Sequence, residues 1–365
     1  MTTSKRFTWV FAFDMFRIGR APVLCALVAV VWLMTMPTAA QSQGTWASRL
    51  GYPAKARVVI LEAEGSGMCY ETTAASAKLM DKNLVQSVSG MAPCPWFGEF
   101  AKWARKQEKK DIGVTLTLTS EWKNYRWRPV SPRGKIPGLA DADGFLWSTP
   151  LQVTYSATPE EVRRELTAQI RHARSAGVRP SHFTSHQGAL FMRPDLARVY
   201  LDIARKHWIP AALIELTPAH IREFREKGFP LSSEMTELIA GYPLPKVDGL
   251  KFSPTAETYE EKVEKLLATI KDAAPGITLI KFQPAVESEA LRRITPDWQQ
   301  RVWDAKLLAD PKVAQFLKEE GVIMTDWREV MQRFDQGPPA EEPAPQKPKK
   351  KPAPKSVEPE PERQP

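Results

Sequence analysis

The sequence contains few cysteines and few histidines. Among 365 residues there are 3 cysteines and 5 histidines, and the histidines are His172, His182, His186, His207 and His220. So few cysteines exclude a disulfide-stabilised scaffold and a protein that binds several zinc ions through thiolates. The five histidines set an upper limit on any metal chemistry that depends on imidazole ligands.

The rest of the composition is that of a globular protein with an excess of basic residues. Hydrophobic residues make up 43% and charged residues 25%, which excludes a chain disordered throughout. The net charge of +9 first suggests nucleic-acid binding. Residues 1–40 carry +3 of it and residues 336–365 carry +1, which leaves only +5 on residues 41–335. We therefore expect no nucleic-acid partner.

Residues 1–40 have the pattern of a secretory signal peptide. Basic residues such as Lys5 and Arg6 precede an apolar run over 21–36, and small residues follow at 37–40. The run is shorter than the roughly 20 residues of a spanning helix. We expect export to the periplasm, the envelope or the medium. The alternative is an uncleaved anchor, in which case the chain meets the membrane through this segment alone. Export would permit a disulfide between Cys69 and Cys94, but spacing cannot show one.

Residues 336–365 are predicted to be a disordered tail rich in proline, lysine and glutamate. They include ten prolines and almost no apolar side chains. Such a segment cannot bury enough surface to offset the entropy of ordering it. The tail either keeps the protein soluble or contacts an anionic polymer or lipid headgroups through its lysine run at 349–351.

The body between these ends alternates strands and helices, which predicts an α/β fold with a mainly parallel sheet, open or closed into a barrel. We expect strands over 57–61, 85–91, 112–119, 181–185, 211–215, 277–282 and 322–325. We expect helices over 71–82, 97–110, 158–176, 194–207, 218–227, 258–273 and 311–320, and one that starts at 295–297. The long irregular stretch 120–157 is typical of a binding element.

Two strand ends carry residues suited to chemistry, and parallel α/β folds place their sites at such ends. Glu62 and Glu64 share one face of the first strand, where they could act as a base and a metal ligand or form a solvated acidic end. His182, Thr184 and His186 share one face of the strand at 181–185. Two histidines so spaced could bind a metal only with a third ligand from elsewhere.

Several segments resemble the YdjC-like (ChbG/HpnK) carbohydrate deacetylases. They include 51–97, 113–127, 143–147, 181–191, 275–284, 294–298 and 321–328, and the resemblance extends from about residue 49 to about residue 332. The resemblance implies a TIM-like β/α barrel. It also implies a divalent metal, zinc or magnesium, that activates water against the acetamide of an N-acetylated sugar, and an acid/base carboxylate.

Most of the residues that the family uses for this reaction are replaced here. The substituted positions are Glu64, Gly65, Thr115, Thr184 and Gln283, which stand for two aspartates, a histidine, an aspartate and a histidine. Glu64 could still act as a base, but glycine offers no ligand and threonine is a poor zinc ligand. His186, and less centrally His182, match the family pattern.

Three hypotheses follow. The first is an exported, catalytically degenerate barrel without a cofactor that binds a glycan or an envelope component. Its possible contact residues are Trp122, Tyr125, Arg126, Trp127 and Trp147, although these side chains could instead pack the long loop onto the barrel. The second is a working deacetylase with a metal centre rebuilt from Glu62, Glu64, His182 and His186. The third, compatible with the first, is an envelope interaction protein that uses the tail.

Overall fold

The computed structural model describes residues 44–226 and 231–337. The predicted signal segment, 1–40, lies outside the described residues, as does the predicted tail from residue 338 onward. Within the two described ranges, no helix is long and apolar enough to cross a membrane.

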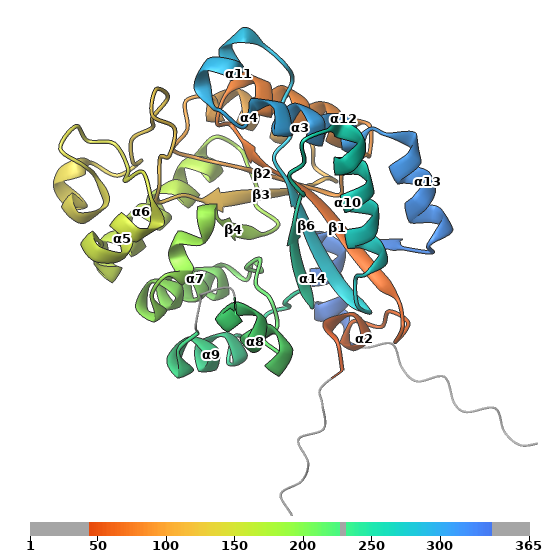
Figure 1. The fold of residues 1–365 in the computed structure, drawn as a ribbon. Helices are drawn as coiled ribbons and strands as arrows, with labels where there is room; N and C mark the ends of the chain where they lie inside the picture. Colours follow the sequence, from red (N-terminus) through yellow and green to blue (C-terminus); the bar gives the residue numbers. More distant parts are fainter. Residues whose placement is uncertain (1–43, 227–230, 338–365) are drawn as a thin grey trace, which may run out of the picture. The chain divides into compact units, whose positions relative to one another are not determined.

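A parallel sheet forms the centre of the fold (Figure 1). Its strands are β1 (Arg57–Ser66), β2 (Ser87–Gly90), β3 (Asp111–Leu116), β4 (Phe183–Ser185), β5 (Gly249–Phe252), β6 (Gly276–Phe282) and β7 (Ile323–Met324). The order is β4-β3-β2-β1-β6-β5, with β7 beside β1, and every pairing between these strands is parallel. The expected TIM-like α/β fold is confirmed. β1 is central and buried along almost its whole length because its apolar and small residues face covered surfaces on both sides.

The segment 211–215 does not form the regular strand that we predicted. Ala211 makes one isolated bridge to Phe183 of β4, and Ile214 makes another to Val247, just before β5. Each side of the segment therefore pairs at a single position with a different neighbour, which is too little for a ladder. The segment still connects the two edge strands and closes the curled sheet between β4 and β5.

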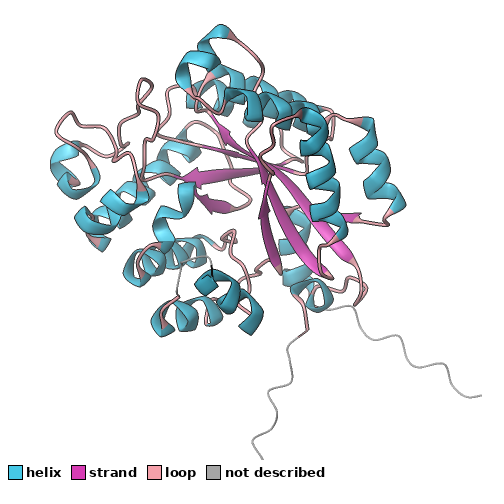
Figure 2. Cartoon of the chain, viewed as in Figure 1, coloured by secondary structure: helices cyan, strands magenta, loops and turns pink. Residues whose placement is uncertain are grey.

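Helices surround the sheet (Figure 2). They are α2 (Trp46–Arg49), α3 (Tyr70–Asp81), α4 (Phe97–Ala104), α5 (Pro150–Ser156), α6 (Pro159–Ser175), α7 (Pro194–His207), α8 (Pro218–Glu226), α9 (Ser233–Ala240), α10 (Tyr259–Lys271), α11 (Glu289–Ile294), α12 (Trp298–Leu308), α13 (Pro311–Glu319) and α14 (Trp327–Gln336). Thr158 caps α6 as expected, because its side chain accepts a hydrogen bond from the Glu161 backbone amide and the Glu161 carboxylate accepts one from the Thr158 backbone amide. α4 ends at Ala104 instead of residue 110, since no apolar side chain follows that could be buried.

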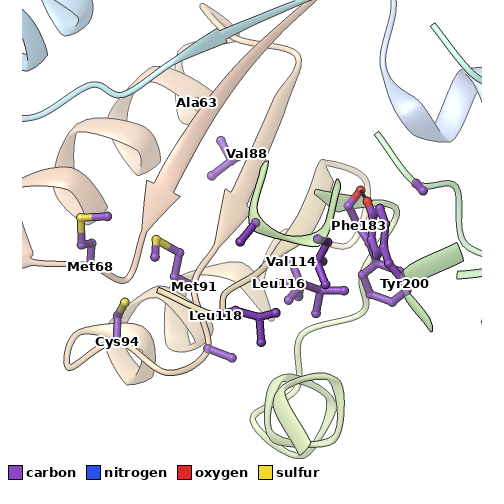
Figure 3. Packing of buried hydrophobic residues seen from close by; sticks show 14 of the residues in the cluster. Ala63, Met68, Val88, Met91, Cys94, Val114, Leu116, Leu118, Phe183 and Tyr200 are labelled. Carbon is purple, nitrogen blue, oxygen red and sulfur yellow. Dashed lines mark hydrogen bonds between the residues drawn. The ribbon is translucent and has the colours of Figure 1, made fainter. Parts of the chain in front are cut away.

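A core of aliphatic and aromatic side chains joins the sheet to its helices (Figure 3). Cys69 and Cys94 are both buried there as free thiols. Two strand glycines make this packing possible. A Cβ at Gly90 would stand 2.1 Å from the Phe100 ring, and one at Gly113 would stand 2.3 Å from the His182 ring. Each glycine therefore allows a ring to lie directly on the backbone.

We expect Gly90→Ala to lower the free energy of unfolding by about 1–3 kcal/mol, because the added methyl overpacks a rigid contact with Phe100. Urea unfolding measures this. The matched control is Gly134→Ala, where an added Cβ meets nothing within 4 Å, and its expected change is below about 1 kcal/mol. Equal effects of the two substitutions would contradict the packing described.

Candidate functional site

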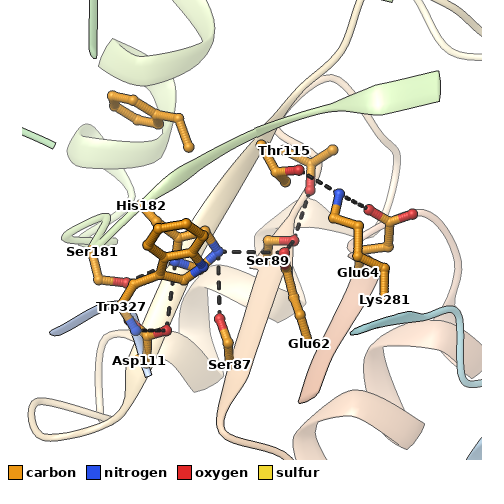
Figure 4. Close-up of polar contacts among 12 residues, drawn as sticks. Glu62, Glu64, Ser87, Ser89, Asp111, Thr115, Ser181, His182, Lys281 and Trp327 are labelled. Carbon is orange, nitrogen blue, oxygen red and sulfur yellow. Dashed lines mark hydrogen bonds and ion pairs between the residues drawn. The ribbon is translucent and has the colours of Figure 1, made fainter. Parts of the chain in front are cut away.

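The interior of the barrel contains a buried ion cluster centred on His182. Its Nε2 lies 3.3 Å from Glu62 Oε1 of β1, and its Nδ1 lies 3.7 Å from Asp111 Oδ2 of β3. Trp327 stacks on the imidazole at 5.7 Å between ring centroids. All four side chains are fully or almost fully buried (Figure 4).

The electrostatics keep this cluster charged. Burial would lower the pKa of His182, but Asp111 and Glu62 outweigh it and raise the pKa to about 9. Burial would likewise raise the pKa of Glu62, but Lys281, His182 and a hydrogen bond from Ser89 lower it to about 2. The imidazolium therefore has a proton on both nitrogens, and its ion pairs with Glu62 of β1 and Asp111 of β3 link these two strands to the residue before β4.

A second cluster lies one pleat further along β1, around the ammonium group of Lys281 in β6. Lys281 Nζ donates to Glu64 Oε2 at 2.6 Å and to the Thr184 hydroxyl of β4. The Gln283 amide donates to the other Glu64 oxygen at 3.1 Å. Burial would lower the pKa of Lys281, but Glu64 and Glu62 outweigh it and raise the pKa. The ammonium therefore stays protonated and has no lone pair for nucleophilic chemistry.

Thr115 is tied to the first cluster. Its hydroxyl donates to Ser89 Oγ at 2.9 Å, and Ser89 donates to Glu62 Oε1 at 2.6 Å. Glu62 and Glu64 thus point into the same interior but have separate partners. This hydrogen-bonded network uses Thr115, Thr184 and Gln283 as neutral connectors.

His186, at the start of the loop after β4, belongs to neither cluster. Its Nε2 lies 3.0 Å from Glu121 Oε2, and this attraction outweighs burial and lowers the pKa of Glu121. Both side chains line a pocket of about 610 Å³ above the strand ends. The other lining residues are Trp122, Lys123, Asn124, Gln187, Gln283, Arg292, Arg293, Ile294, Thr295, Pro296, Asp297 and Arg301.

The aromatic and arginine side chains of the stretch 120–157 mostly make contacts within this stretch or at its start. Trp127 is buried and donates to the Thr119 carbonyl, and the half-buried Trp147 donates to the Gly138 carbonyl. Arg126 pairs with Asp141, and Tyr125 lies beside Trp122. Of the five residues considered for glycan contact, only Trp122 lines the pocket.

Comparison with known proteins identifies the family of this chain. The model of the family described as "YdjC-like protein" matches residues 58–319, most of the chain. The chain belongs to the YdjC-like family. A carbohydrate deacetylase of Thermus thermophilus is 32% identical over 231 residues, which cover 62% of this chain and 80% of the relative. One of Enterococcus faecalis is 24% identical over 74% of this chain and 97% of the relative.

A solved structure supports the same fold. The crystal structure of a putative cellobiose-phosphate cleavage protein from Enterococcus faecalis V583 superposes with a TM-score of 0.62 at 22% identity. It covers 75% of this chain and 99% of that one.

The named relatives are carbohydrate deacetylases, and the residues of this YdjC-like protein do not fit the divalent metal that the family resemblance implies. Gly65 has no side chain, and Thr115, Thr184 and Gln283 are neutral and engaged as described above. Lys281 holds a positive charge against the remaining carboxylate, Glu64. Among the described residues, no group of three or more histidine, cysteine, aspartate or glutamate side chains is placed to hold a metal ion.

Sequence reasoning missed four residues of this YdjC-like protein. Asp111 and Glu121 carry no spacing signal, because their partners are distant in the chain. Arg301 lies in the helix that we predicted to start at 295–297, and nothing in the sequence around it indicates that its side chain lines a pocket. Lys281 had a visible signal: it is a lysine within the otherwise uncharged and mostly apolar run Ile277–Phe282, and a lysine in a buried strand requires a buried anion.

The His182 cluster predicts a pH dependence of stability. A histidine whose pKa is raised on folding stabilises the fold below its unfolded pKa, about 6.5, and this contribution is lost as the pH rises toward 9. We expect the free energy of unfolding to fall between pH 6.5 and 9. His182→Gln should remove most of this slope and cost about 3–5 kcal/mol at neutral pH by leaving buried carboxylates unpaired. Denaturant titrations at four pH values measure both.

The exposed His172 provides the control. His172→Gln should leave the slope and the neutral-pH stability near those of the wild type. A slope that His182→Gln does not reduce would contradict a charged imidazole in the core.

Proposed function

We propose that this protein is an exported, catalytically degenerate member of its family that binds a glycan or an envelope component. The observation that carries the proposal is the Lys281 ammonium, held by Glu64 and Thr184. Both partners stand at positions where the family resemblance puts residues of the metal site. The Lys281 ammonium therefore supplies positive charge at a site where residues expected from the family resemblance, such as those at Gly65 and Thr115, are replaced.

The charge of Lys281 argues against a divalent metal beside Glu64. At an effective dielectric constant of about 20, a divalent ion about 4 Å from an ammonium is repelled by roughly 8 kcal/mol. A ligand set would have to overcome this repulsion, and Gly65 and Thr115 contribute no strong ligand.

Glu64 is also poorly placed to act as a base. One oxygen accepts from Lys281 and the other from Gln283. Both carboxylate oxygens are therefore engaged, and Glu64 could accept a proton from a water molecule only by giving up one of these hydrogen bonds.

Glycan binding is supported by the family and by the pocket above the strand ends. The named relatives are carbohydrate deacetylases. The pocket of about 610 Å³ combines the Trp122 ring with amide and hydroxyl side chains from Asn124, Gln187 and Thr295. Sugar recognition uses such a combination of an apolar surface and a few polar groups.

The alternative is an active N-deacetylase with a rebuilt metal centre. It would need Glu62, Glu64, His182 and His186 to turn toward one ion. Their present partners are different: Glu62 pairs with His182, Glu64 with Lys281, and His186 with Glu121. Three ion pairs would have to be broken together.

Export is proposed from the N-terminal sequence alone, with its basic start, its apolar run and its small residues at 37–40. An envelope partner for the proline-rich tail is compatible with it.

We expect the purified full chain, supplied with zinc, magnesium or cobalt, to release no acetate from N-acetylglucosamine oligomers above the no-protein blank. Elemental analysis should find well below one zinc per chain. The Thermus thermophilus relative serves as the positive control, and Glu64→Gln is the matched variant. Stoichiometric metal with acetate release that Glu64→Gln abolishes would establish the active alternative instead.

We further expect saturable binding of an N-acetylated sugar oligomer at this pocket, measured by calorimetry. Asn124→Ala should weaken it about threefold or more by removing one hydrogen bond. Glu237→Ala, which changes an exposed residue of a different hollow between α7 and α9, is the control and should have no effect. Equal affinities for the two variants and the wild type would show that the sugar does not bind here.

A further inference from the structure

Arg301 of α12 is a buried cation whose side chain has unsatisfied hydrogen-bond donors. The residue lines the pocket above the strand ends and is only 5% exposed. Among the residues that the structure describes, no acceptor reaches its Nε or Nη1. Buried guanidinium groups are normally paired, so this group lacks the partner that its burial calls for.

The side chains around the Arg301 guanidinium support it without accepting hydrogen bonds from its Nε or Nη1. The Trp122 ring lies 5.0 Å from Arg301 Cζ, so an aromatic face supports the cation from one side. The carboxylates that act on its charge are Glu121, Asp304 and Asp297, and Glu121, which has the largest effect, is already paired with His186. Burial lowers the pKa of Arg301, yet a guanidinium remains charged at neutral pH.

The charge of the pocket lining favours an anionic ligand with a single charge. Lys123, Arg292, Arg293 and Arg301 stand against two carboxylates, Glu121 and Asp297. Arg292 and Arg293 are exposed and paired with Glu287 and Glu289, which leaves Arg301 as the buried cation with open donors in this lining. A planar carboxylate matches a guanidinium fork. Glu121 is likewise paired with His186, so Lys123 and Arg301 stand against Asp297, an excess of one positive charge that a phosphate, with about −1.5 to −2 charges at neutral pH, would exceed.

We propose that Arg301 binds the carboxylate of an acidic sugar, so that the preferred glycan contains a carboxylated residue. This inference rests on the proposed glycan-binding function and narrows it to one ligand class. The Trp122 ring orients the guanidinium, and the carboxylate of the ligand accepts the hydrogen bonds for which the described residues offer no acceptor.

The experiment compares three probes on the full chain by calorimetry: a neutral N-acetylglucosamine oligomer, an oligomer of equal length that contains a uronic acid, and a sugar phosphate. We expect the uronic-acid probe to bind at least tenfold more tightly than the neutral one and more tightly than the phosphate. Arg301→Met should remove this preference and leave neutral binding within about twofold. Arg301→Lys should retain only part of it, and Arg293→Gln, the rim control, should keep most of it.

A thermal-unfolding readout separates recognition from a structural role. Because Arg301 donates no hydrogen bond from Nε or Nη1 within the described chain, Arg301→Met should not lower the midpoint of unfolding. Equal wild-type affinity for acidic and neutral probes, tighter phosphate binding, or an unchanged preference in both Arg301 variants would overturn the carboxylate site. Binding of none of the probes would overturn the proposed function as well.

Discussion

The interior of this barrel depends on one interaction, the ion pair between Lys281 and Glu64. Lys281 comes from β6, Glu64 from β1, and the hydroxyl that completes the ammonium shell from Thr184 of β4. The Lys281 ammonium thus connects the neighbouring strands β1 and β6 with β4, which lies at one edge of the sheet. A buried charge is tolerated only with such compensation, so replacing Lys281 or Glu64 would leave the other charge without its ion-pair partner.

The His182 cluster extends the same arrangement by one pleat. Its imidazolium lies between Glu62 and Asp111, and Lys281 also lowers the pKa of Glu62. The two layers together hold two cations and three carboxylates inside a sheet whose remaining core is apolar. A divalent metal in this region would need these carboxylates free for it; here the chain's own cations occupy them. In the proposed function, the pocket above the strand ends is the surface for recognition.

Much of the fold could be predicted from the sequence, since β-branched runs such as 57–61 and caps such as Thr158 are local signals. The segment 211–215 could not, because whether it forms a ladder depends on neighbours at 183 and 247. β5, with half-exposed and exposed residues at an edge, has no alternating pattern to find. For the site, the substitutions at Gly65 and Thr115 were visible against the family pattern. The position of the Lys281 ammonium could not be predicted, because it depends on the pairing of β1 with β6, which places Lys281 directly across from Glu62.

The most direct test is a crystal structure of the full chain soaked in zinc, with anomalous diffraction recorded at the zinc edge. The account predicts that Lys281 Nζ remains between Glu64 and Thr184 and that no anomalous peak lies within ligand distance of either side chain. A zinc peak bound by Glu64 together with His186 or His182, with Lys281 displaced, would contradict it.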